Sequence, residues 1–245
     1  MSIKLLTIDY WNTIFDSSNG YGRNAYRMKS LVEEIDRMGI IIKKDELDKA
    51  MEATWEFFNK VWTEEQRTPM PKESVEFYWN FLKLPKSDRA IKNIVHAFAI
   101  SILEHPPKVL PDARKTIEKL SKDYDLAIIS DTGFSPGTIL MELLKRNELD
   151  TYFKAFSFSD ETGVSKPQTK AYQYILDQFN YSVEECCHIG DIERTDVAGA
   201  KAMGMHAILF AGDDTGLFQD KDGKPTKADF TAHSWKEIPD IIKSI

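Results

Sequence analysis

Short, almost continuously apolar runs recur along the chain, and most of them end at small or polar residues. A run that is apolar at nearly every position is typical of a strand buried on both faces. Between the later runs, apolar residues recur at helical spacing. This alternation predicts a parallel sheet with helices on both faces and right-handed crossovers. The predicted strands are residues 3–8, 126–129, 155–158, 186–189 and 207–210, and the predicted helices are residues 112–120, 137–146, 169–179 and 197–203.

Residues 17–105, between the first two predicted strands, follow a different pattern. They contain no convincing strand, and Pro69 and Pro71 mark a break between two helical halves. We therefore predict a core domain of residues 1–16 and 106–245, interrupted by a helical domain of residues 17–105. Helices are expected at residues 26–38, 44–62, 74–82 and 87–103, around a core containing Trp55, Phe57, Phe58, Trp62, Phe77, Tyr78, Trp79 and Phe81.

The polar residues that follow the predicted strands are the candidates for chemistry. Ligands of open parallel sheets bind outside the carboxyl ends of the strands, where such residues gather. In chain order, these residues are Asp9, Asn12 and Thr13 after the first strand, Ser130, Asp131 and Thr132 after the second, Lys166 in the loop before the helix at 169–179, and Asp191 and Asp196 after the fourth.

This set contains the parts that phosphoryl transfer needs. A carboxylate such as Asp9 can attack phosphorus and form an aspartyl-phosphate. Several carboxylates around one hard cation hold Mg²⁺, while a lysine, a hydroxyl and backbone N–H groups stabilise the phosphoryl oxygens. Each residue alone has a plainer explanation, with Asp9 as a turn residue, Ser130 as a helix cap and Lys166 as a solvated lysine. Their joint order along the chain favours the chemical interpretation.

The composition narrows the partners and the compartment. A formal net charge of −7 argues against a nucleic-acid backbone or an anionic membrane as the main partner. No apolar run approaches the roughly 20 residues of a membrane-spanning helix, and the first residues lack a signal-peptide layout. The only cysteines, Cys186 and Cys187, are adjacent in a predicted strand, which indicates buried free thiols rather than a disulfide or a zinc site. We therefore expect a cytoplasmic protein, either a monomer or a homodimer.

The sequence resembles the haloacid dehalogenase (HAD) superfamily over essentially its whole length. The matching stretches are LLTIDYWNTIFD, LAIISDTG, GVSKPQTKAY and HIGDIERTDVAGAKAMGM. The insertion resembles the cap that many members place between their first and second motifs, and the tail ADFTAHSWKEIPDII resembles their last strand and helix. The resemblance implies an α/β fold with a HAD-like Rossmannoid core and an inserted all-helical cap domain. It also implies a Mg²⁺-dependent phosphohydrolase or phosphotransferase that acts on a small phosphorylated metabolite.

Carried over residue by residue, the resemblance implies a metal site and a nucleophile. Asp9 is expected to be the nucleophile, with its carboxylate also touching Mg²⁺. Asp191 is expected to be the main metal ligand of the fourth motif, and Asp196 a second ligand or a partner of the metal shell. The backbone carbonyl of Trp11 is expected to complete the protein's share of the ligands.

The resemblance also implies the residues that hold the phosphoryl group. Ser130 is expected to bind this group, and Lys166 to pair with it and with Asp9. Thr13 is expected to orient the nucleophile loop. The candidates for contacts with the rest of the substrate are Trp11, Asn12, Asp131 and Thr132 in the motifs, and Arg23, Arg27, Trp62 and Arg67 in the cap.

Trp11 departs from the family pattern. Phosphatases of the superfamily usually carry a second aspartate two residues after the nucleophile, which protonates the departing alcohol and then activates water. An indole can do neither, because it is only an N–H donor, and general acid–base help is typically worth about 10²–10⁴ in rate. The enzyme would then favour leaving groups that depart unprotonated, such as acyl phosphates, or would take the proton from a cap residue such as Asp16, Glu64 or His96.

Two other functions remain open from the sequence. 2-Haloacid dehalogenases also carry an aromatic residue two positions after the nucleophile, and a halide leaves without a proton. The metal-free dehalogenases, however, place a serine where this chain has Asp191, and a carboxylate beside Asp9 without a cation is electrostatically costly. Phosphotransfer is therefore favoured over dehalogenation. The third candidate is a non-hydrolytic binding or regulatory protein that retains the Mg²⁺–phosphate site.

Overall fold

A parallel sheet forms the centre of the protein. The structure, a computed structural model, describes residues 2–216 and 225–245. Within them the strands lie in the order β3-β2-β1-β4-β5-β6, and every neighbouring pair is parallel. The strands are β1 (Leu5–Ile8), β2 (Asp125–Ser130), β3 (Ala155–Phe158), β4 (Cys186–Gly190), β5 (His206–Phe210) and β6 (Phe230–Ala232). The predicted α/β fold with a parallel sheet is confirmed.

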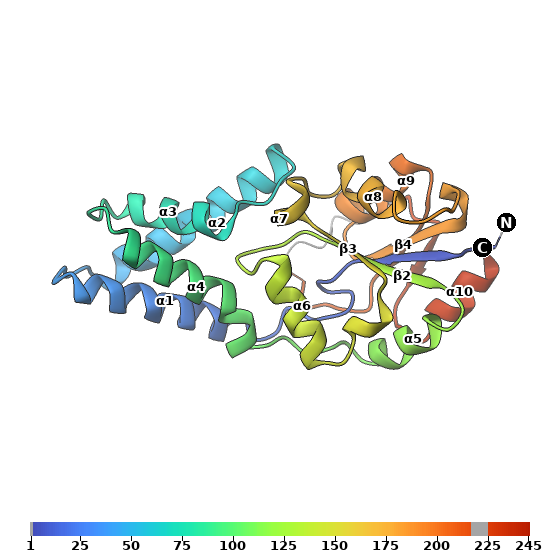
Figure 1. Ribbon diagram of the computed structural model, residues 1–245, viewed down its shortest axis with the longest axis horizontal. Helices are drawn as coiled ribbons and strands as arrows, with labels where there is room; N and C mark the ends of the chain where they lie inside the picture. Colours follow the sequence, from blue (N-terminus) through green and yellow to red (C-terminus); the bar gives the residue numbers. More distant parts are fainter. Residues whose placement is uncertain (1, 217–224) are drawn as a thin grey trace.

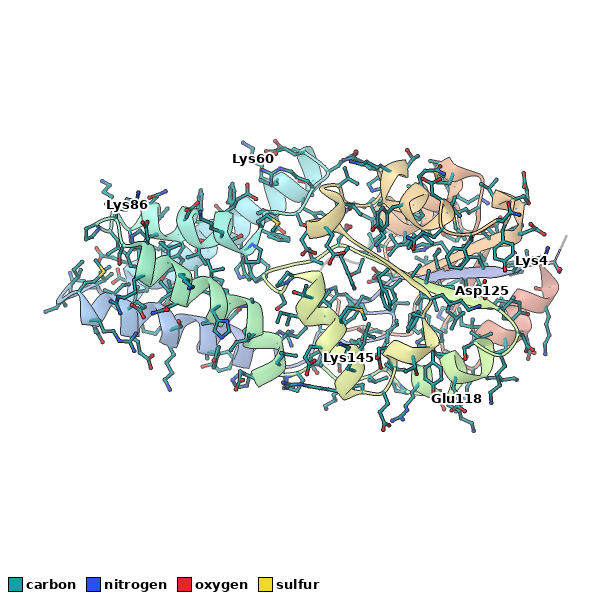
Figure 2. All side chains as sticks on the ribbon, viewed as in Figure 1. Lys4, Lys60, Lys86, Glu118, Asp125 and Lys145 are labelled. Carbon is teal, nitrogen blue, oxygen red and sulfur yellow. The ribbon has the colours of Figure 1, made fainter. Side chains whose placement is uncertain are left out.

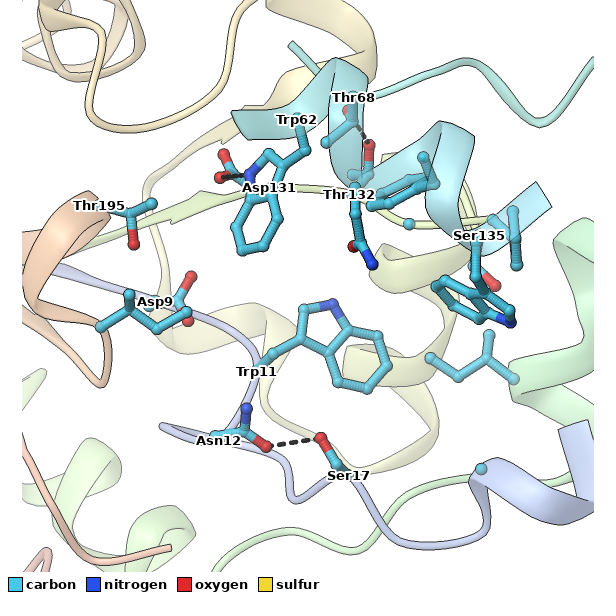
Figure 3. Close-up of a pocket in the computed structure, with 18 of the residues that line it drawn as sticks. Asp9, Trp11, Asn12, Ser17, Trp62, Thr68, Asp131, Thr132, Ser135 and Thr195 are labelled. Carbon is cyan, nitrogen blue, oxygen red and sulfur yellow. Dashed lines mark hydrogen bonds between the residues drawn. The ribbon is translucent and has the colours of Figure 1, made fainter. Parts of the chain in front are cut away.

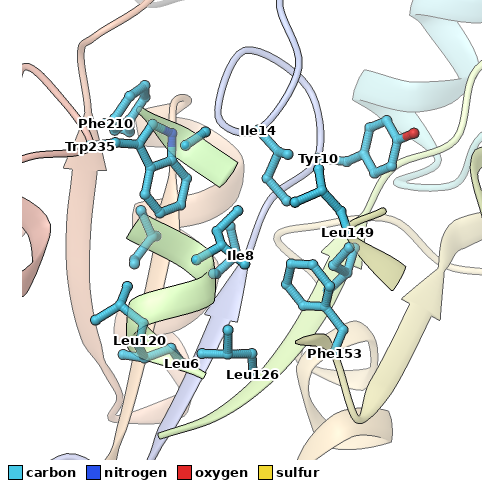
Figure 4. Close-up of a cluster of buried hydrophobic side chains, with 14 of the residues drawn as sticks. Leu6, Ile8, Tyr10, Ile14, Leu120, Leu126, Leu149, Phe153, Phe210 and Trp235 are labelled. Carbon is cyan, nitrogen blue, oxygen red and sulfur yellow. The ribbon is translucent and has the colours of Figure 1, made fainter. Parts of the chain in front are cut away.

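Helices cover both faces of this sheet (Figure 1). They are α5 (Ala113–Leu120), α6 (Gly137–Arg146), α7 (Ser159–Thr162), α8 (Thr169–Leu176), α9 (Ala198–Met203) and α10 (Ile238–Ser244). Leu6 and Ile8 of β1 pack in a cluster with α5, α6 and α10, which Figure 4 shows in close-up. Leu5 faces the other way and packs with residues of α8 and α9. The strand is therefore buried on both faces, as its continuous apolar run predicts.

Four helices between β1 and β2 form the cap. They are α1 (Gly20–Arg37), α2 (Lys44–Glu64), α3 (Pro71–Phe81) and α4 (Asp88–Glu104), and they lie beyond the carboxyl ends of the strands (Figure 1). Pro71 is tolerated as the first residue of α3 because that position needs no N–H donor. The apolar faces of these helices share one cluster, which also takes in Phe134 and Ile192 from the core. Three of the aromatic side chains expected in this core lie outside the cluster. Phe81 at the end of α3 is 47% exposed, and the half-buried Phe57 and Phe77 stack on each other with ring centres 4.5 Å apart.

Several element boundaries differ from the prediction. α1 begins at Gly20 rather than near residue 26, because its first two turns present Arg23 and Arg27 inward instead of apolar side chains. α8 ends at Leu176, and the chain continues in tighter turns in which the Phe179 N–H donates to the Leu176 carbonyl at 3.1 Å. α9 is preceded by a π-helical turn, η3 (Glu193–Val197), that carries Asp196.

The exterior is polar and carries both signs of charge. Figure 2 shows Lys60, Lys86, Glu118 and Lys145 projecting outward from the cap and the core. Cys186 and Cys187 are free and buried, as expected. Among the helices of residues 2–216 and 225–245, none combines the length and the apolar composition that crossing a membrane requires.

Candidate active site

The carboxyl ends of the two central strands bring Asp9 and Asp191 together. Asp9 follows β1 and Asp191 follows β4, and these strands pair in register, with Ile8 opposite Ile189. The strand order also reverses here, because the chain runs from β1 to β2 on one side and later returns to β4 on the other. This is the position at which open parallel sheets form a ligand crevice. Strand pairing thus places two residues 182 positions apart in one site.

Lys166 joins this pair from the loop between α7 and α8. Its ammonium group donates a short hydrogen bond to Asp9 and lies 2.6 Å from Oδ1 of Asp196. All three side chains are buried. Burial opposes the charge of Lys166, but the carboxylates of Asp196 and Asp9 raise its pKa well above the usual range. Lys166 is therefore a fixed cation beside Asp9 at any ordinary pH.

Both carboxylate oxygens of Asp196 accept hydrogen bonds from the protein, and one of them accepts from Lys166. Its Oδ1 accepts from Lys166 and from His188 Nε2 at 2.9 Å, and its Oδ2 accepts from the Ile192 N–H at 3.0 Å. Burial alone would raise the pKa of this carboxyl, but the charge of Lys166 and the hydrogen bond from His188 lower it. An additional Cβ at Gly190 would lie 2.3 Å from Cγ of Asp196, so this position needs glycine.

His188 is a buried support that the sequence reasoning missed. It lies within β4 opposite Thr7 of β1, and Thr7 Oγ1 is 2.8 Å from its Nδ1. Burial lowers the pKa of His188, although Asp196 opposes this effect. Since a carboxylate can only accept, the neutral ring carries its proton on Nε2 and accepts from Thr7 on Nδ1. The signal in the sequence was a polar residue in each of two strands that are otherwise apolar.

The acidic residues of the site exceed its positive charge. One carboxylate oxygen each of Asp9, Asp191 and Asp196 lie within 4.8 Å of one another. Burial raises the pKa of Asp9 to about 7, even though Lys166 lowers it. Burial and then the charge of Asp9 raise the pKa of Asp191 well above its usual range, and its Oδ2 is buried without a hydrogen-bond partner in the described region.

This arrangement fits a hard divalent cation. An unpartnered buried carboxylate oxygen beside a second carboxylate is costly unless a cation or a proton neutralises it. Asp191 Oδ2 and the carboxylate of Asp9 supply the oxygen ligands that Mg²⁺ prefers. Asp196 has both oxygens occupied by protein donors, so it is better placed as a support than as a ligand.

The residues after β2 connect the core to the cap. Oδ1 of Asp131 accepts from the Lys166 backbone N–H at 3.0 Å, and Oδ2 accepts from Trp62 Nε1 at 2.7 Å (Figure 3). The Thr132 N–H donates to Ser159 Oγ at 2.8 Å. The Ser130 hydroxyl lies 3.5 Å from the Asp131 carbonyl and does not line the cavity of the site. Its role as a phosphoryl ligand remains a prediction.

The loop after Asp9 carries Trp11, Asn12 and Thr13. The Trp11 indole projects into the cavity between the core and the cap (Figure 3). Asn12 accepts from Ser17 Oγ at 2.6 Å, and a hydrogen bond from its amide lowers the pKa of Asp191 against the effect of burial. The Thr13 hydroxyl is buried without a partner in the described region, while its carbonyl accepts from Trp235 Nε1 at 2.6 Å. This bond fixes the loop to the core.

A cavity of about 550 Å³ lies over Asp9, between the core and α1, α2 and α4 of the cap. Arg23 and Arg27 line it, as does Trp62, whereas Arg67 pairs with Glu65 at 2.9 Å outside it. The cavity is not lined by any of the three candidate proton donors, which are Asp16, Glu64 and His96. The expectation that one of them supplies the proton is therefore not supported by the geometry of this structure.

Comparison with known proteins places the chain among hydrolases. A family model described as haloacid dehalogenase-like hydrolase matches residues 3–204. Glyceraldehyde 3-phosphate phosphatase of Pyrococcus furiosus is 38% identical over 104 residues, which is 41% of either protein. Ribulose-1,5-bisphosphate 5-phosphatase of Halopiger xanaduensis is 28% identical over 138 residues, which is 55% of this chain and 56% of that protein. The matched region thus spans about half the length of these relatives.

The fold also matches solved structures over nearly its full length. The crystal structure of a 2-haloacid dehalogenase from Pseudomonas syringae pv. Tomato has a TM-score of 0.73 and covers 99% of both chains. Its sequence identity is 21%, so the likeness concerns the fold and not the reaction.

Proposed function

Because the chain belongs to the haloacid dehalogenase-like hydrolases, we propose that it is a Mg²⁺-dependent phosphatase in which Asp9 carries the phosphoryl group. The observation that supports this most is the pairing of Lys166 with Asp9 beside an unpartnered buried oxygen of Asp191. A buried carboxylate, a buried cation and a vacant oxygen ligand are the protein's share of a phosphoryl-transfer site.

The substrate class follows from the relatives and from the size of the cavity. The named relatives act on glyceraldehyde 3-phosphate and on ribulose-1,5-bisphosphate, which are small phosphorylated sugars. A cavity of about 550 Å³ accommodates a metabolite of that size. We assign the same class, a small phosphorylated sugar or related metabolite, to this chain.

In the first step, a carboxylate oxygen of Asp9 forms a bond to phosphorus as the bond from phosphorus to the leaving oxygen breaks. The electron pair departs with the leaving group. Lys166 stays fixed beside Asp9 through Asp196, and its charge stabilises the phosphoryl oxygens. Water then attacks the phosphorus of the aspartyl-phosphate, which releases inorganic phosphate and restores the Asp9 carboxylate. Asp9, Asp191 and the Trp11 carbonyl would hold Mg²⁺, which would neutralise charge on the phosphoryl group.

Trp11 sets the limits of this chemistry. No carboxylate stands at the position from which family phosphatases protonate the leaving oxygen, and the indole has no proton to give at ordinary pH. We therefore propose that the enzyme favours leaving groups that are stable as anions, or that the leaving group takes its proton from solvent. Trp11 itself lines the cavity, and the Arg23 guanidinium lies 5.9 Å from its ring centre.

Dehalogenation is the second candidate, and Trp11 is the observation that favours it. An attack of Asp9 on carbon with loss of halide needs no general acid. The buried Asp191 speaks against it, because a second carboxylate beside the nucleophile would repel the Asp9 carboxylate unless a cation is bound.

The test is phosphate release from acetyl phosphate and p-nitrophenyl phosphate, with Mg²⁺ and with a chelator. We expect turnover only with Mg²⁺, and a loss of at least about 10³-fold in Asp9→Asn. Asp36→Asn, which removes an exposed carboxylate of α1, serves as the matched control and should retain full activity. Turnover that persists with the chelator would reject the proposal. Chloride release from L-2-chloropropionate without metal would support dehalogenation instead, and binding of Mg²⁺ and phosphate without any turnover would indicate a non-hydrolytic protein.

A further inference from the structure

Arg27 of α1 is a buried cation that pairs with no carboxylate of residues 2–216 and 225–245. Its side chain is 6% exposed and lines the cavity above Asp9. Nε donates to Ser101 Oγ at 3.0 Å, and Nη1 donates to Asn24 Oδ1 at 2.9 Å. A guanidinium has five N–H donors, so more than half of its donor capacity has no acceptor among residues 2–216 and 225–245. No carboxylate of these residues forms an ion pair with it.

The surroundings of Arg27 do not compensate its charge. The guanidinium lies 4.7 Å from the ring centre of Phe134 and 5.8 Å from that of Phe98. Burial, followed by the nearby charge of Arg23, lowers the pKa of Arg27 to about 9. Aromatic faces attract a cation, but this attraction offsets only part of the hydration free energy that the cation loses on burial. The Arg27 guanidinium therefore presents unused N–H donors, from an apolar wall of the cavity, that an anionic acceptor could bind.

Arg23, one turn earlier, is used differently. Its Nη1 donates to the Ser18 carbonyl at 2.7 Å and to the His105 carbonyl at 3.3 Å, and its Nη2 donates to the Ser17 carbonyl at 3.2 Å. These carbonyls lie where the chain enters and leaves the cap. Arg23 therefore ties the two crossings together, while Arg27 keeps donors for a ligand.

Two chemically distinct cations line the cavity. Lys166 is balanced by Asp9 and Asp196, and it receives the phosphoryl group under the proposed function. Arg27 lies among Phe134 and other aromatic side chains and pairs with no carboxylate of the described residues. A substrate with a phosphoryl group and a neutral remainder would leave the second cation uncompensated.

We propose that Arg27 binds a second anionic group of the substrate, so that the preferred substrates carry a carboxylate or a second phosphate in addition to the phosphoryl group that is removed. This inference rests on the proposed phosphatase function and makes it more specific. A planar guanidinium can bind either group through two parallel N–H bonds. The substrate spans the cavity from Asp9 past Trp11 to Arg27, and Arg27 discriminates against phosphorylated compounds with a neutral end.

The experiment compares substrates that differ only in the second anion. One pair is 3-phosphoglycerate and glycerol 3-phosphate, and the other is ribulose 1,5-bisphosphate and ribulose 5-phosphate. For the wild type we expect kcat/KM to be about 10- to 100-fold higher for one of the two anionic members, since a hydrogen bond to a charged group has this strength. The anionic member with the higher kcat/KM shows whether Arg27 recognises the carboxylate or the second phosphate.

Variants identify the residue responsible. Arg27→Met should remove the advantage, chiefly by raising KM for the preferred anionic member. Arg27→Lys should retain part of the advantage, because lysine keeps the positive charge but lacks the two parallel N–H donors of the guanidinium. Lys29→Met, which removes an exposed charge from the same helix, is the matched control and should leave the preference intact. The thermal transition of each variant shows whether it is folded.

Two results would overturn the inference. Equal kcat/KM within both pairs in a wild type that hydrolyses acetyl phosphate would reject the second-anion site and leave the proposed function standing. An advantage that survives Arg27→Met in a folded variant would also reject it. If the wild type hydrolyses none of these compounds, acetyl phosphate included, the proposed function fails and the inference fails with it.

Discussion

The ammonium group of Lys166 lies 2.6 Å from Oδ1 of Asp196, in a pair that is almost completely buried. Asp196 in turn accepts from His188, which Thr7 orients from the neighbouring strand. Lys166 is therefore held by a chain of hydrogen bonds that begins inside the sheet. Such a chain fixes the position of the cation before the substrate arrives, which is what stabilisation of a developing charge requires.

The first prediction concerns this pair. Asp196→Asn should lower kcat/KM by about 10- to 100-fold, because Lys166 loses the anion that fixes it. Lys166→Met should cost at least as much, and the double variant should be little worse than Lys166→Met alone, since the two residues act as a unit. Steady-state kinetics of the wild type, the two single variants and the double variant give the coupling free energy between Asp196 and Lys166. Asp48→Asn, which breaks an exposed ion pair with Lys44 in the cap, is the control. Additive losses would mean that Asp196 acts independently of Lys166.

The second prediction concerns Trp11. If the missing acid limits turnover, Trp11→Asp should raise kcat for alkyl phosphates by about 10-fold or more and change kcat for p-nitrophenyl phosphate much less. The reason is that only a poor leaving group needs the proton. Phosphate release from both substrates, in the wild type and the variant, decides the question. An equal change for both would show that the position does not act through the leaving group.

The third prediction concerns the contact between cap and core. Trp62→Phe keeps the ring but removes the Nε1 hydrogen bond to Asp131, measured at 2.7 Å. The contact between cap and core loses about 1.5 kcal/mol or more, the usual strength of a hydrogen bond to a charged group. KM should rise by about 10-fold. Trp79→Phe is the matched control, because Trp79 Nε1 donates at 3.0 Å to the Pro85 carbonyl within the cap itself. It should lower the thermal stability without raising KM.

The fourth prediction concerns pH and metal. Without metal, the folded-state pKa of Asp9 is about 7, above the value of about 3.9 in an unfolded chain. The fold favours the protonated form, so this contribution to stability is present below about pH 4 and is lost as the pH rises through about 7. Burial shifts Asp191 in the same direction. Mg²⁺ binds the deprotonated pair and should therefore raise Tm more at pH 8 than at pH 5.

Differential scanning fluorimetry with Mg²⁺ or a chelator measures this difference. Asp191→Asn should abolish the Mg²⁺-induced shift and stabilise the metal-free protein at pH 8, because it removes a buried carboxylate whose Oδ2 has no hydrogen-bond partner among residues 2–216 and 225–245. A shift of Tm that is the same at both pH values would contradict the electrostatic account of the site.

Much of the sheet could be predicted from the sequence, because buried strands leave continuous apolar runs. The run at Ala155–Phe158 matched the observed β3, and the helix at Gly137–Arg146 matched α6. The beginning of α1 was missed, since its first two turns bury two arginines and show no apolar spacing. The π-helical turn at Glu193–Val197 was also missed, because a single widened turn has no periodicity of its own.

The candidate site was predictable where a residue follows a strand directly. Asp9 and Asp191 were brought together by strand order, which the sequence pattern indicates, whereas Lys166 joins them from the loop between α7 and α8. The hydrogen bond from His188 to Asp196 depends on strand register. The lack of an ion pair between Arg27 and a carboxylate of the described residues depends on how the cap packs. Neither property can be read from local sequence, since each is set by residues far away along the chain.

The most direct measurement is the covalent state of Asp9 during turnover. The protein is mixed with acetyl phosphate and Mg²⁺, quenched in acid, digested and examined by mass spectrometry. We predict that one phosphoryl group is attached to Asp9 in the wild type and in Lys166→Met at lower yield, and that Asp9→Asn carries none. Steady release of phosphate while Asp9 remains unmodified, or a phosphoryl group on another residue, would contradict the account.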